Sequence, residues 1–191
     1  MIGAVAAISS VVFTGWATYV SAKVAQDQLE QSREDNEKEE RRQASRVTFW
    51  TEGSSLGSVG LTVHLVNRTP DPVNRGHIHV RTPKKSATDV YDVTGDVPAV
   101  PPCSELVFKM ADQKAGIPDP ASGKPRGMAL TGGLPPWKYE FVDNNGVVWV
   151  RMERSLERGA EGDLYHGAEG SFYVKHFETR PVKPCDEYSS K

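Results

Sequence analysis

The sequence predicts a mainly β protein: an N-terminal transmembrane helix continues into a charged helix, and an antiparallel β-sandwich of seven or eight strands follows. Three observations lead to this fold class. Residues 1–22 carry no charged side chain, residues 23–44 are rich in charge and contain neither Gly nor Pro, and from Ser45 onward apolar residues alternate with polar ones. The chain therefore divides into an anchor (1–22), a spacer (23–44), a β-sandwich domain (45–178) and a flexible tail (179–191).

The first segment, residues 1–22, is long enough to cross a membrane. At about 1.5 Å of rise per residue, a helix of 22 residues covers the ~30 Å hydrocarbon core of a bilayer. Trp16 and Tyr19 favour the membrane interface, where the segment would leave the bilayer. We therefore expect an uncleaved anchor in the cell membrane, with the lipid bilayer as its partner.

A cleaved secretory signal is the main alternative for this segment. Val20-Ser21-Ala22 offers small residues at which a signal peptidase could cut, but only the terminal amine supplies positive charge before Ile2. Small residues four apart, such as Gly3 and Ala7, would also let two such helices approach closely. Self-association through the anchor is therefore a further hypothesis.

Cations beyond the apolar segment orient the predicted anchor. Lys23, Arg33 and Lys38 all lie on its C-terminal side, so the positive-inside rule favours a cytoplasmic C-terminal domain over an outside one. The spacer is predicted to be a helix that is solvated on all sides. No apolar residue lies between Leu29 and Ala44, which leaves no seam for a coiled coil.

The domain after Ser45 reads as a succession of short strands. Asn67-Arg68-Thr69-Pro70 marks a turn, and the Gly- and Pro-rich stretch from Asp112 to Pro136 predicts a long surface loop. Alternation predicts strands at residues 46–50, 59–65, 77–81, 88–93, 105–110, 137–142, 147–152 and 171–177.

The clearest local pattern is a β-hairpin. Phe141-Val142-Asp143-Asn144-Asn145-Gly146-Val147-Val148-Trp149 places a turn tolerant of positive φ between two alternating runs. The number and spacing of strands resemble the immunoglobulin-like class, without its Cys…Trp…Cys pattern. Together with the anchor, the charged helix and the Asn67 turn, the chain resembles uncharacterised single-pass membrane-anchored proteins of high-GC Gram-positive bacteria. That resemblance implies no activity.

The two cysteines, Cys103 and Cys185, could form one disulfide. Outside the cytoplasm such a bridge would tie the C-terminal tail to the domain, whereas inside it both thiols would stay reduced. Their number does not decide between these two states.

No residue pattern points to catalysis or to a cofactor. His64, His77 and His79 could in principle gather around zinc, but alternation places His77 and His79 outward, where an exposed histidine is ordinary. A phosphate-loop motif is absent, and a net charge of −2 gives no footprint for nucleic acid. We therefore expect no enzyme activity, no catalytic or metal-binding residue and no cofactor.

These observations lead to one favoured function and two alternatives. We expect a membrane-tethered, non-enzymatic module that binds another protein of unknown identity, with Trp137, Tyr139 and Trp149 on the contacting surface. The first alternative is a secreted or surface domain, released after Ala22 and closed by the disulfide. The second is a metal-dependent enzyme that uses the three histidines.

Overall fold

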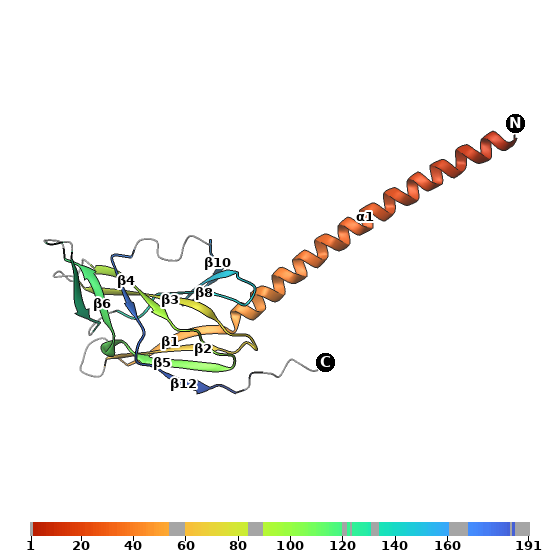
Figure 1. Ribbon diagram of the computed structural model, residues 1–191. Helices are drawn as coiled ribbons and strands as arrows, with labels where there is room; N and C mark the ends of the chain where they lie inside the picture. The colour runs from red at the N-terminus through yellow and green to blue at the C-terminus, as the bar shows by residue number, and fades with distance from the viewer. Residues whose placement is uncertain are drawn as a thin grey trace. The chain divides into compact units, whose positions relative to one another are not determined.

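The computed structural model describes residues 2–53, 60–83, 90–119, 122, 124–130, 134–160, 168–183 and 185, without the side chains of 2–15, 17, 83 and 118. The described chain is mainly β, with two sheets and one long α-helix (Figure 1). It separates into two compact units, Met1–Arg42 and Gln43–Lys191.

The helix α1 spans Ile2–Ser45, which confirms that residues 23–44 are helical. From Thr18 to Glu39 its residues are exposed, and pairs such as Lys38 with Glu34 support it locally. Within the described part of the chain, no helix is both long and apolar enough to cross a membrane. Most side chains of the predicted anchor lie outside the described residues, so the anchor stays a prediction.

The strands form a four-stranded and an eight-stranded sheet. The smaller sheet has the order β1-β2-β5-β12 and the larger the order β10-β9-β8-β3-β4-β11-β6-β7. Neighbours pair antiparallel except β11 and β4, which pair parallel. The smaller sheet contains β1 (Val47–Gly53), β2 (Leu61–Asn67), β5 (Ser104–Lys109) and β12 (Glu178–Pro181). The larger contains β3 (Asn74–Pro83), β4 (Val90–Val97), β6 (Lys114–Pro118), β7 (Pro125–Ala129), β8 (Lys138–Val142), β9 (Val148–Met152), β10 (Leu156–Arg158) and β11 (Gly170–Tyr173).

Four sequence predictions about the β domain were wrong. The predicted surface loop from Asp112 to Pro136 contains the hairpin of β6 and β7, after a 3-10 turn, η1 (Met110–Asp112). The predicted flexible tail begins inside β12, which pairs with β5. The described residues therefore form twelve strands instead of seven or eight, and one pair is parallel. β6 and β12 have only five and four residues, too few for a clear alternation.

One hydrophobic core lies between the two sheets. Side chains that alternate along the strands meet there, each contributing about 1.5–3 kcal/mol on full burial. From the smaller sheet come Val63, Leu65, Leu106 and Phe108, and from the larger come Ile78, Val80, Tyr139 and Phe141.

The residues that lead into β1 are part of the β unit. Ala44 and Val47 are 2% and 3% exposed within its core. The Arg151 guanidinium on β9 donates hydrogen bonds to the carbonyl oxygens of Ser45, at 3.0 Å, and Val47, at 3.2 Å. These contacts fix the start of the first strand against the second sheet.

Candidate functional site

The three histidines do not gather into one site. His64 lies on β2 in the smaller sheet, whereas His77 and His79 lie on β3 in the larger one. Within the described part of the chain, no group of three or more His, Cys, Asp or Glu side chains is placed to hold a metal ion. The zinc-dependent enzyme therefore has no support from this geometry.

His77 and His79 were expected to be exposed, and that prediction was wrong. They are 5% and 2% exposed, while their neighbours Ile78 and Val80 are completely buried. Both faces of β3 are therefore buried from Gly76 to Val80, where the histidines have polar partners on the adjacent strands. His77 Nδ1 lies 2.8 Å from Asp96 Oδ1 on β4.

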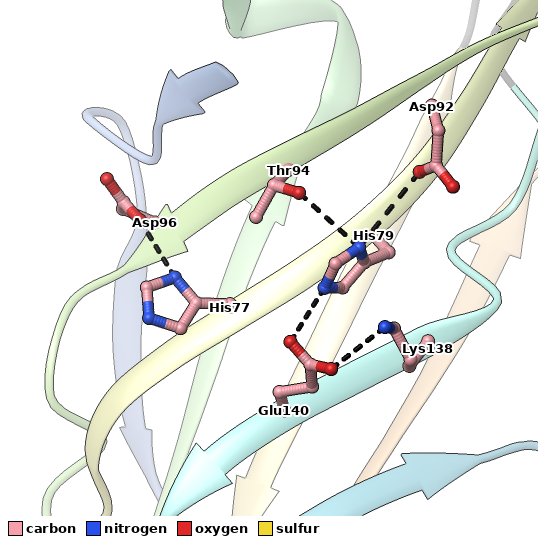
Figure 2. A network of polar contacts seen from close by, with 7 residues as sticks. All are labelled: His77, His79, Asp92, Thr94, Asp96, Lys138 and Glu140. Carbon is pink, nitrogen blue, oxygen red and sulfur yellow. Dashed lines mark hydrogen bonds and ion pairs between the residues drawn. The ribbon is translucent and has the colours of Figure 1, made fainter. Parts of the chain in front are cut away.

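His79 belongs to a buried polar network that spans three strands (Figure 2). Its Nε2 lies 2.9 Å from Glu140 Oε2 on β8, and Lys138 Nζ lies 2.8 Å from the other carboxylate oxygen. On the other side, His79 Nδ1 lies 3.4 Å from Thr94 Oγ1 and 4.0 Å from Asp92 Oδ1 on β4. The network ties β4, β3 and β8 together.

Glu140 is ionised within this network. Burial raises its pKa, but hydrogen bonds from His79 and Lys138 outweigh that effect, so the net pKa is below the ordinary value. Glu140 and His79 are 1% and 2% exposed, so the centre of the network is shielded from solvent. The network therefore ties the three strands together.

A second histidine cluster lies on the outer face of the smaller sheet. His64 Nδ1 is 2.7 Å from Glu105 Oε1 on β5, and His64 Nε2 is 3.6 Å from Glu52 Oε2 on β1. Trp50 stacks on the imidazole with ring centroids 5.0 Å apart and planes 6° apart. Strand register explains the cluster, because His64 is opposite Trp50 on one side and Val107 on the other.

A groove of about 630 Å³ opens beside this cluster. Its floor is the outer face of the smaller sheet, and the segment Lys175–Phe177 forms one wall. Three acidic and three basic side chains line it, so it does not favour a ligand of a single sign of charge. The lining residues are Glu52, Thr62, His64, Val107, Phe108, Lys109, Asp112, Lys175, His176, Phe177, Glu178 and Arg180.

The predicted partner surface is mostly buried. Tyr139 is completely buried and Trp149 is 4% exposed, with its Nε1 donating to Asp143 Oδ2 at 2.8 Å. Trp137 is half-buried, with the Arg81 guanidinium 4.7 Å from its ring centroid. Tyr139 and Trp149 therefore pack in the core and cannot form a contacting surface in this fold.

The two cysteines form a disulfide, which is one of the two states that the sequence left open. Cys103 and Cys185 are bonded with their Cα atoms 5.3 Å apart, inside the usual range for such bridges. Val182 N also donates to Cys103 O at 2.8 Å. These contacts attach the chain beyond β12 to the start of β5.

Sequence reasoning missed the structural role of Asn67. Its side chain is completely buried, and Nδ2 donates to the carbonyl oxygens of Asp71, Val100 and Pro101. Oδ1 accepts hydrogen bonds from the backbone and side chain of Thr69. The available sequence signal was Pro70, three residues after Asn67. It indicated a turn but not the buried hydrogen bonds of the Asn67 side chain.

Comparison with known proteins adds no assignment: no family model, no curated protein and no solved structure matches this chain. The described residues form a two-sheet β protein with an N-terminal helix and a groove on its smaller sheet.

Proposed function

We propose that this chain is a non-enzymatic binding module, in which a helical anchor and spacer carry an immunoglobulin-like β-sandwich outside the cytoplasm. The strand order supports the immunoglobulin-like part. β1, β2 and β5 correspond to strands A, B and E of that fold, and β9, β8, β3 and β4 correspond to G, F, C and C′. The remaining strands extend both sheets.

The disulfide is the observation that carries the proposed location. Disulfides persist in oxidising compartments and are rare in the cytosol. The Cys103–Cys185 bridge joins two points 82 residues apart and includes both cysteines of the chain. We therefore favour the outside orientation over the cytoplasmic one, since only Lys23 lies immediately next to the apolar segment and the charge bias is small.

Thiol labelling in intact cells tests this location. A membrane-impermeant maleimide should label the full-length protein only after an impermeant reductant has opened the bridge. Cys103→Ser is the matched control, because it leaves Cys185 as a lone thiol that should be labelled without reduction. Labelling that requires cell lysis but no reductant would contradict the outside location.

The groove on the smaller sheet is our proposed contact surface for a protein partner. Phe177 lines it and is 44% exposed, and nearby Trp50 is 38% exposed, so two large aromatic side chains are within reach of a partner. A photo-crosslinking amino acid at position 177 should yield discrete adducts in cells. The control position is Glu157, exposed on β10 in the other sheet. Equal adduct yields at both positions would count against the groove.

A further inference from the structure

One ring nitrogen of His64 is buried without a hydrogen bond. Nε2 has no hydrogen-bond partner among the described residues, and the imidazole is only 9% exposed. Buried polar atoms nearly always have a partner, and an exception points to a water or an ion. Glu52, whose side chain is 68% exposed, stays at 3.6 Å, beyond the ~3.2 Å limit of a hydrogen bond.

The spacing of these two groups suits a metal ion. Zinc binds imidazole nitrogen at about 2.0–2.1 Å and carboxylate oxygen at about 2.0–2.2 Å, so two tetrahedral ligands lie about 3.4 Å apart. His64 Nε2 and Glu52 Oε2 are 3.6 Å apart. We propose that His64 and Glu52 bind one divalent transition-metal ion, such as Zn²⁺, at the edge of the groove.

Glu105 is the positioning residue of this site. Its Oε1 lies 2.7 Å from His64 Nδ1, on the side of the ring opposite Glu52. A carboxylate that accepts the Nδ1 proton leaves the lone pair on Nε2 and fixes the ring orientation, as in the carboxylate–histidine–metal arrangement. Trp50 restrains the ring further by stacking on it.

Two protein ligands leave the other coordination positions to water. His64 and Glu52 both line the groove, so these positions can be filled from it. Imidazole and carboxylate together suit zinc and neighbouring first-row metals. This two-ligand site also differs from the zinc site of three histidines considered from the sequence, because those histidines lie in two different sheets.

Calorimetric titration of tag-free, full-length, oxidised protein with ZnCl₂ at pH 7.5 tests the proposal. We expect one equivalent to bind, and Glu105→Gln to weaken binding by about 10–100-fold. Glu52→Gln removes a ligand from an exposed position and should weaken binding by more than about tenfold. His176→Ala, which removes another histidine of the groove, should leave the affinity unchanged.

Trp50 provides a second measurement at the same site. Cu²⁺ at His64 should quench the fluorescence of Trp50, so Trp50→Phe should lose that quenching and still bind zinc. Absence of zinc binding by the wild type would overturn the proposal. Equal zinc affinity in the wild type and in Glu52→Gln would overturn it as well.

Discussion

Replacing Asn67 by Asp should destabilise the β domain strongly, although the two side chains have nearly the same shape. The carboxylate can still accept both hydrogen bonds from Thr69. Its second oxygen, however, would face the carbonyl oxygens of Asp71, Val100 and Pro101, now 2.7, 3.2 and 3.1 Å from the Nδ2 donor. An attractive contact would become a repulsive one in a buried site.

The magnitude follows from the bonds that change. The two N–H donors contribute about 0.5–1.5 kcal/mol each. A buried charge without an opposite charge costs about 3–5 kcal/mol, and the two retained hydrogen bonds from Thr69 offset part of this total. We expect Asn67→Asp to lower the free energy of unfolding by about 3–5 kcal/mol, a large share of the ~5–15 kcal/mol that a domain possesses. The loss should shrink as pH falls, because the introduced carboxyl then becomes neutral and regains a donor.

Urea unfolding followed by tryptophan fluorescence measures this loss, because Trp149 reports on the core. The matched control is Asn144→Asp in the exposed hairpin turn, which should change stability by less than about 0.5 kcal/mol. A change below about 1 kcal/mol for Asn67→Asp would refute the assigned hydrogen-bond pattern.

Three further predictions concern stability. Cys103→Ser should cost at most about 4.5 kcal/mol from the chain entropy of an 82-residue loop, and a dithiol reductant should lower the urea midpoint of the wild type but not of the variant. Tyr139→Phe should leave the urea midpoint unchanged or raise it, because the buried hydroxyl, whose pKa is raised by burial, has no hydrogen-bond partner among the described residues; a loss above about 1 kcal/mol would indicate an unseen hydrogen bond. Glu140→Gln should cost about 1.5–3 kcal/mol at neutral pH. Because the folded-state pKa of Glu140 is lowered, its contribution is present above the unfolded pKa and is lost as pH falls, so the stability of the wild type should decline more steeply below about pH 5 than that of the variant.

The hairpin was the most predictable part of the fold. Regular alternation and the Asn-Gly turn predicted β8 and β9, whose register places Phe141 opposite Trp149. Both signals are local, so no knowledge of the rest of the fold was needed. β6 and β12 could not be predicted in this way, because short strands depend on their partners for stability.

Alternation also could not predict how deeply the polar residues lie. Alternation correctly placed the side chains of His79 and Val80 on opposite faces of β3. It wrongly assigned the polar face to solvent. The face is buried because Glu140 and Lys138 complete the hydrogen bonding of the imidazole network. These partners lie 61 and 59 residues away in the chain, and only the pairing of β3 with β8 brings them together.

The disulfide and the groove are physically connected, which joins the proposed location to the proposed contact surface. Glu178 and Arg180 on β12 line the groove, and β12 is held by pairing with β5 and by the nearby Cys103–Cys185 bridge. A four-residue edge strand with exposed side chains has little burial of its own to keep it in place. In a reducing compartment, the part of the groove formed by β12 would therefore depend on the four residue pairings between β12 and β5. A binding surface built this way is best maintained where the bridge is oxidised, and this favours the outside location independently of the charge distribution around the predicted anchor.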